Sequence, residues 1–79
     1  MDPFLGEILY VAFNFPPRGF HNCDGTLLPI ASNTALFALL GTTYGGDGIH
    51  NFALPKLPPP LDHGGLYVIA LQGVFPSRD

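Results

Sequence analysis

Charged side chains are scarce in this 79-residue chain, where three basic and six acidic residues make up only 11%. Soluble domains typically carry about 25%. Hydrophobic residues reach 47%, although a domain of this size hides only about 60% of its unfolded surface. We therefore expect one small domain, residues 1–79, whose surface is largely covered by copies of itself. A neutral monomer with a Ser/Thr/Asn surface is the alternative.

The chain also lacks a basic cluster and a long apolar run. Its three cations, Arg18, Lys56 and Arg78, are scattered, and the net charge is −3. These features exclude the electrostatic footprint of a nucleic-acid binder. Pro, Gly or polar residues interrupt every apolar run, so we expect no membrane insertion. Acidic residues stand near the start of the chain, where a secretory signal would be basic, so we expect no N-terminal signal peptide.

Groups suited to catalysis or metal binding are few. Cys23 is the only cysteine, which excludes an intramolecular disulfide. His21, His50 and His63 are spread through the chain and do not have the spacing of zinc ligands. No nucleophile, base and oxyanion site can be assembled from the sequence. We expect neither an enzyme nor a cofactor or metal.

Two long apolar segments lie near the ends of the chain. Residues 4–15 and 66–75 both predict strands in which the two alternating sets of side chains are apolar. A small domain with a single short helix cannot cover both faces of both strands. We therefore expect copies to associate by strand addition. The predicted assembly contacts are Leu9, Val11, Phe13, Tyr67, Ile69, Leu71 and Phe75.

The middle of the chain predicts one short helix at about residues 33–40. Ser32 or Asn33 is suited to be the N-cap, and Gly41 follows where a left-handed residue often ends a helix. The apolar side chains at i, i+3 and i+4 predict a face that holds the helix to the core. These side chains are Leu36, Leu39 and Leu40.

Short strands are expected on both sides of this helix. Residues 20–23 and 26–30 predict a hairpin around the Asp24-Gly25 turn, and residues 49–54 predict a further strand. A connector rich in Pro and Gly follows at residues 55–65. Several short strands with one helix indicate an α+β fold.

The central block of the chain resembles the signature of the phage tail collar domain family. The departures are Phe20, where the family usually has Trp, and the lack of a Pro-Ser-His-Thr-His-like segment after the Ala-Leu-Pro stretch. The matching pieces are Gly6-Glu7-Ile8, Pro17-Arg18-Gly19-Phe20, Cys23-Asp24-Gly25, Leu28-Pro29-Ile30, Asn33-Thr34-Ala35-Leu36-Phe37, Leu39-Leu40-Gly41-Thr42-Thr43-Tyr44-Gly45-Gly46-Asp47-Gly48 and Phe52-Ala53-Leu54-Pro55.

The resemblance implies a small collar-type domain with a structural role. We expect a non-enzymatic, self-assembling subunit of a tail-like fibre or extracellular filament, located in an extracellular fibre or a virion tail. The alternative is an adhesin module that binds host surface glycans through an exposed loop. Tyr44, Asp47, His50 and Asn51 would then hold the sugar. In the structural role, Gly41 and Gly46 are expected to preserve the shape of the backbone.

Overall fold

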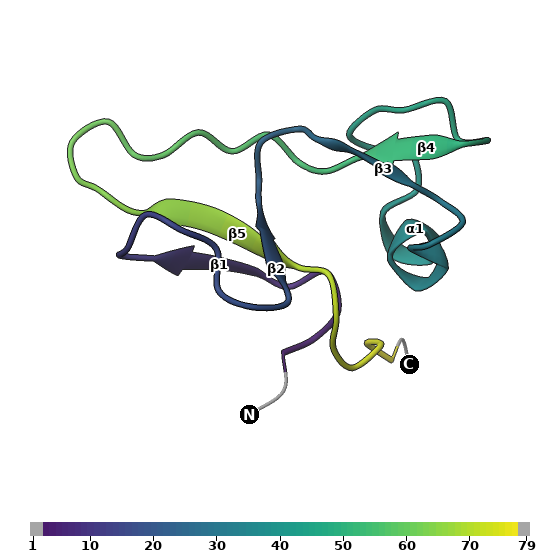
Figure 1. Ribbon diagram of the computed structural model, residues 1–79, viewed down its shortest axis with the longest axis horizontal. Coiled ribbons are helices and arrows are strands. Elements are labelled where there is room, and N and C mark those ends of the chain that lie inside the picture. The colour runs from purple at the N-terminus through teal and green to yellow at the C-terminus, as the bar shows by residue number, and fades with distance from the viewer. Residues whose placement is uncertain (1–2, 78–79) are drawn as a thin grey trace.

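The computed structural model describes residues 3–77, which form two small antiparallel sheets and one helix and confirm the α+β fold class. Both outer ends of the expected domain, residues 1–2 and 78–79, lie outside the described residues. The two sheets lie at opposite sides of the molecule, with the helix next to the smaller one (Figure 1). The elements are β1 (Ile8–Val11), β2 (Phe20–Asn22), β3 (Leu27–Pro29), α1 (Thr34–Leu40), β4 (Asn51–Ala53) and β5 (Leu66–Ala70).

β5 is the central strand of the three-stranded sheet, between β1 and β2. Ile8 lies opposite Ile69 in the β1–β5 register, and Phe20 lies opposite Ala70 in the β2–β5 register. The first and last strands of the chain therefore pair with each other. Val68, Ile69 and Ala70 are all buried, because a central strand has neighbours on both edges and here also on both faces.

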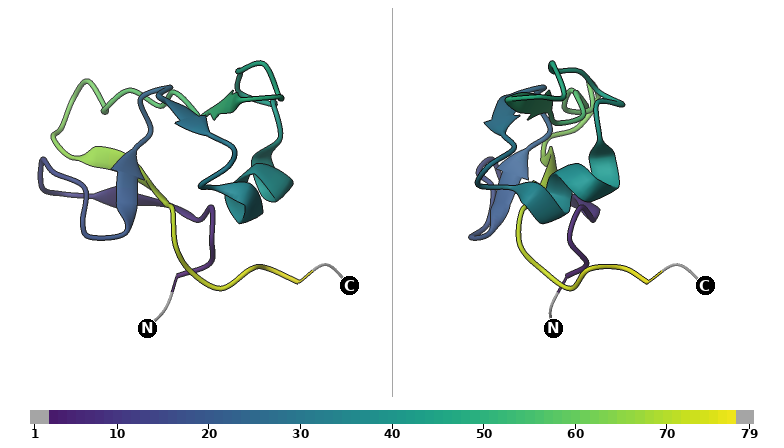
Figure 2. Two further views of the ribbon diagram at one scale, coloured as in Figure 1. Left: turned by 45° about the vertical axis from the view of Figure 1, so that its right-hand side comes forward. Right: turned by 90° about the vertical axis from the view of Figure 1, so that its right-hand side faces the viewer.

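The terminal strands are shorter than predicted, since β1 has four residues and β5 has five. After Ala70 the chain leaves the sheet and packs against the N-terminal segment. A Cβ atom at Gly73 would lie 2.4 Å from the carbonyl oxygen of Pro3, and Phe4 forms an isolated parallel bridge with Val74. The described ends of the chain emerge on the same side of the molecule (Figure 2).

The predicted hairpin around Asp24-Gly25 is wrong. β2 pairs with β5, whereas β3 pairs with β4 in the second sheet, where Leu28 lies opposite Phe52. The turn is nevertheless present, because Asp24 Oδ1 accepts the N–H of Thr26 at 3.1 Å. It carries the chain from one sheet to the other. Burial of apolar residues from distant segments outweighs the local pairing that the turn alone favours.

The predicted helix is confirmed as α1, with Asn33 at the N-cap position. The Asn33 side chain does not cap the helix; it donates instead to the carbonyl of Pro29 at 2.9 Å. Gly41 has a positive φ of 55° and a ψ of −144°, so it is not a left-handed helical residue. Its N–H still closes the helix by donating to Phe37 O at 2.8 Å.

The core joins both sheets and the helix. Leu36 from α1, Phe52 and Leu54 from the β4 region and Ile69 from β5 form one buried cluster. Leu40 is half-buried, whereas Leu39 is 37% exposed. The predicted apolar face of α1 is therefore confirmed at Leu36 and is only partial at Leu39, because a seven-residue helix at the edge of a small core turns one side to solvent.

Candidate assembly surface

β1 exposes the opposite set of side chains from the one that the sequence favoured. Leu9 and Val11 are half-buried, whereas Ile8 and Tyr10 are 39% and 44% exposed. Both sets are apolar, so alternation alone gave no signal for choosing between them. Ile8 and Tyr10 thus offer more surface to a partner than Leu9 and Val11.

The placement of Ile69 in an assembly interface is wrong. Its side chain has no exposed surface and belongs to the core cluster, so it cannot contact another copy while the domain remains folded. Tyr67 and Leu71 are half-buried and pack against the same cluster. The sequence showed two apolar faces on this strand, and the structure covers most of both within a single chain.

Large apolar side chains remain exposed on both terminal segments. Phe13 and Phe75, which the sequence predicted as contacts, are 44% and 51% exposed. The ring centroids of Phe13 and Phe15 lie 4.8 Å apart with 36° between the ring planes, so the two rings form a tilted aromatic pair at the surface. We define the terminal apolar surface as the seven exposed residues of these segments: Phe4, Ile8, Tyr10, Phe13, Phe15, Val74 and Phe75.

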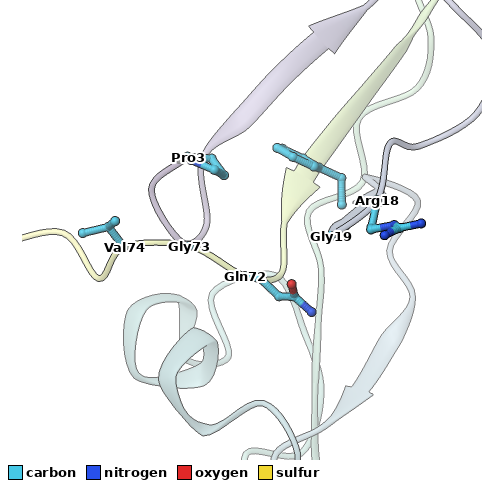
Figure 3. Close-up of a pocket in the computed structure, with 7 residues that line it drawn as sticks. Pro3, Arg18, Gly19, Gln72, Gly73 and Val74 are labelled. Carbon is cyan, nitrogen blue, oxygen red and sulfur yellow. The ribbon is translucent and has the colours of Figure 1, made fainter. Parts of the chain in front are cut away.

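Main-chain hydrogen bonds hold the two terminal segments side by side. The N–H of Leu5 donates to Val74 O at 2.8 Å, and the N–H of Val74 donates to Pro3 O at 2.9 Å. A pocket of about 430 Å³ adjoins this pair. Figure 3 shows the side chains of Arg18 and Gln72 on the side of the pocket away from Pro3 and Val74. Pairing of the ends thus brings part of the terminal apolar surface together.

The loop of the alternative glycan site is organised around Asp47. One oxygen of its carboxylate, Oδ1, accepts the N–H groups of Ile49, His50 and Asn51 at 2.8, 2.8 and 3.0 Å. Asn51 Oδ1 in turn accepts the N–H of Asp47 at 2.9 Å. Three of the four predicted ligand residues are therefore brought together, but they bond to one another.

These hydrogen bonds also set the charge of the loop. The main-chain N–H of His50, followed by those of Ile49 and Asn51, holds the pKa of Asp47 far below its usual range. The carboxylate is ionised at neutral pH, but its Oδ1 is already occupied by amides. Tyr44 is 49% exposed and is free to stack on a ligand, whereas Asp47 serves mainly the loop itself.

The remaining polar groups of residues 3–77 do not gather into a second site. His21, His50 and His63 lie 3.9, 3.4 and 2.6 Å from the nearby carboxylates of Asp24, Asp47 and Asp62, and such exposed pairs contribute little. Within residues 3–77, no three His, Cys, Asp or Glu residues gather as metal ligands would. In the same part of the chain, no helix is long and apolar enough to cross a membrane.

A family model described as the Phage Tail Collar Domain matches residues 6–58, about two thirds of the chain. The chain belongs to the phage tail collar domain family. No curated protein and no solved structure matches it. The matched region contains β1 to β4 and α1 and ends before β5, although β5 is the strand around which the larger sheet forms.

Membership in the collar family gives the chain a broad role. The domain is a structural module of the phage tail-fibre type, and the family places it with the virion tail. The family is a structural one rather than a family of enzymes.

Proposed function

We propose that this collar domain is a self-assembling subunit of a tail-like fibre or extracellular filament. Copies join through their terminal segments, by contacts of the terminal apolar surface and by strand addition. The observation that carries the proposal is this surface itself. Phe4, Phe13, Phe15, Val74 and Phe75 remain 44–60% exposed after the core has formed.

The chemistry of the terminal segments favours association over solvation. Burial of apolar surface contributes about 25 cal/mol per Å², so several half-exposed aromatic rings can supply substantial interface energy. Single exposed apolar residues are normal, but clusters of them mark interaction sites. Glu7 is the only charged residue between Pro3 and Pro17, so little charge has to be desolvated when copies meet.

A glycan-binding role for the 44–51 loop has weaker support. Exposed Tyr44 suits stacking on a sugar. Asp47 Oδ1, by contrast, accepts three main-chain amides of its own loop, which limits its use as an acceptor for sugar hydroxyls. A glycan array with the wild type and Tyr44→Ala tests this role separately from assembly.

Light scattering during size-exclusion chromatography tests the proposal at micromolar concentration. We expect the wild type to elute as an assembly and the double variant Phe13→Ser/Phe15→Ser to shift to a much smaller particle mass. The matched control is Leu27→Ser/Ile49→Ser, which removes two side chains that are 55% and 76% exposed elsewhere on the molecule. This control should assemble like the wild type.

Negative-stain microscopy of the same fractions shows whether the assembly is an open fibre or a closed ring. A wild type that stays a clean monomer at micromolar concentration contradicts the proposal. A control variant that dissociates as readily as the Phe13/Phe15 variant contradicts the assignment of assembly to the terminal segments.

A further inference from the structure

The two sheets have four outer edges, and the edge of β4 is sealed by the loop before it. The N–H of Ala53 donates to Gly45 O at 3.0 Å, and the N–H of Gly48 donates to Asn51 O at 3.0 Å. The N–H of Asn51 donates to Asp47 Oδ1 at 3.0 Å. These bonds occupy three of the four outward main-chain groups of β4, namely both groups of Asn51 and the N–H of Ala53, so little is left for a further strand to pair with.

The edge of β3 is blocked by proline. The N–H of Ile30 donates to His50 O and the N–H of Leu54 donates to Thr26 O, both at 3.0 Å. The alternation of an antiparallel ladder then turns Leu27 and Pro29 outwards. Pro29 has no N–H group, and a proline on an edge strand is a common protection against further pairing.

The edge of β2 is short and flanked by charge. This strand has three residues, and the N–H of Phe20 is already donated to Pro17 O at 3.0 Å. Arg18 stands before the strand and Asp24 stands after it. A short strand between charged neighbours is a poor template for pairing.

The edge of β1 has none of these protections. The N–H of Ala70 donates to Glu7 O at 2.9 Å, so the antiparallel alternation directs Leu9 and Val11 towards β5 and leaves the main-chain groups of Ile8 and Tyr10 facing outwards. No residue of the described chain bonds to these outward groups.

Local chemistry keeps this edge open. β1 contains neither proline nor a charged residue, and the side chains of its outward residues, Ile8 and Tyr10, are partly exposed. The nearest charge, Glu7, is engaged, because its Oε1 accepts the N–H of Phe4 at 2.9 Å. An apolar edge strand that has no proline, no free charge beside it and no bonded outward main-chain groups is a template for pairing with another chain.

We propose that the β1 edge is the strand-addition site and that it pairs antiparallel with β1 of a second copy. The two-fold axis passes at Leu9, so that Ile8 of each copy exchanges both main-chain hydrogen bonds with Tyr10 of the other. The inference rests on the proposed function, namely that copies assemble, and it names the edge, the partner strand and the register.

The second copy fits this edge because the strand is self-complementary. β1 has two outward residues, and the two-fold axis at Leu9 satisfies both at once. In this register Glu7 lies opposite Val11 of the second copy, so no like charges meet. The pairing joins two three-stranded sheets into one continuous sheet. A two-fold contact closes on itself, so Phe13, Phe15 and Phe75 remain available to link such pairs into a fibre.

A matched pair of charge variants tests the edge. Ile8→Lys places a cation on the β1 edge, and Ile49→Lys makes the same change at a more exposed isoleucine beside the sealed β4 edge. We expect Ile8→Lys to lower the apparent association constant at least tenfold in sedimentation and Ile49→Lys to leave it within about twofold. Equal loss in both variants overturns the edge assignment.

The register is tested by cross-linking. Leu9 lies opposite Leu9 of the second copy as a non-hydrogen-bonded pair, in which Cβ atoms are about 4.5–5.5 Å apart, near the distance that a disulfide needs. Mild oxidation of Leu9→Cys should therefore yield a covalent dimer, whereas Ile49→Cys should not. Native Cys23 is buried and does not compete.

Hydrogen exchange of the wild type separates this inference from the proposed function and does not depend on a variant folding. We expect the amides of Ile8 and Tyr10 to exchange at least tenfold more slowly in the assembly than in the dilute monomer. Assembly in which these amides stay unprotected overturns the β1 pairing and leaves self-assembly standing. Absence of any assembly overturns both.

Discussion

The two sheets of this collar domain differ in how far the main-chain groups along their outer edges are hydrogen-bonded. In the smaller sheet, the loop before β4 folds back along the strand, and its Gly45 O, Gly48 N–H and Asp47 Oδ1 bond to three of the four outward main-chain groups of β4. The larger sheet leaves the β1 edge unpaired, and exposed phenylalanines precede and follow this strand in the sequence. One small chain thus combines a sheet completed from within with a sheet suited to completion by a partner.

The residues beside each strand explain the difference. Glycines precede β4, and Gly46 allows the loop to lie so close that a Cβ atom there would come within 2.4 Å of Phe52 Cα. Phenylalanines and the pair Pro16-Pro17 follow β1, and proline cannot donate a main-chain hydrogen bond to a neighbouring strand. The segment after β1 is therefore suited to packing against apolar surface rather than to sealing an edge.

The largest effect should come from Ile69→Asp, which breaks the larger sheet at its centre. Ile69 is fully buried, and an isolated charge there has no partner to offset its desolvation. Truncation of a buried isoleucine to alanine already costs about 2–5 kcal/mol. We expect Ile69→Asp to abolish folding, measured as loss of the cooperative thermal transition in circular dichroism. A folded Ile69→Asp domain would contradict the position of β5 in the core.

A smaller loss of stability is expected for Gly46→Ala, which should displace the loop that is hydrogen-bonded along the outer edge of β4. The new methyl group would meet the backbone of Phe52, and φ of +95° is strained for alanine, so we expect a loss of roughly 1–3 kcal/mol in urea unfolding. Gly41→Ala is the control, because its φ is also positive but no atom lies within 4 Å of its Cβ position. Equal losses would show that close approach is unimportant at Gly46.

Asp47→Asn should alter the pH dependence of the stability of the domain, because Asp47 holds the same loop by main-chain hydrogen bonds. Amides of the loop lower the pKa of Asp47 in the folded state. A lowered pKa stabilises the fold above the unfolded pKa of about 3.9, and this stabilisation is lost as the pH falls through the folded value. The wild type should therefore exceed Asp47→Asn in melting temperature at pH 7, and this difference should begin to shrink below about pH 4 and become small towards pH 2. An unchanged difference at both pH values would contradict this role.

The control for this pH experiment is Asp62→Asn. Asp62 accepts no main-chain amide from residues 3–77, so its replacement should give melting temperatures close to those of the wild type at both pH values. A pH-dependent effect as large as that of Asp47→Asn would show that overall charge, rather than the loop bonds, controls the difference.

The smallest effect is expected for Leu27→Ser on the proline-blocked edge of β3. Leu27 is 55% exposed, and surface substitutions of this kind usually change stability by less than about 0.5 kcal/mol. Both the urea midpoint and the association state should stay unchanged. A clear loss of assembly in Leu27→Ser would mean that the smaller sheet also meets other copies and would remove the contrast between the two sheets.

Local sequence was a good guide wherever one segment decided its own structure. The run of helix formers after Asn33 predicted α1, and the shortage of charge predicted exposed apolar segments at the two ends. Register and partner choice were not readable in this way. Asp24-Gly25 favoured a hairpin, yet β2 and β3 belong to different sheets. The two alternating sets of side chains on β1 are equally apolar, so the sequence did not indicate that Ile8 and Tyr10 are the more exposed pair.

The sequence by itself determined the composition of the surface, the position of the helix and the family signature, because each of these depends on residues close together in the chain. Tertiary structure alone decided that β5 is central, that Ile69 belongs to the core and that β1 is the open edge. Such choices depend on which distant segments bury each other best, and that competition is settled only when the whole chain packs.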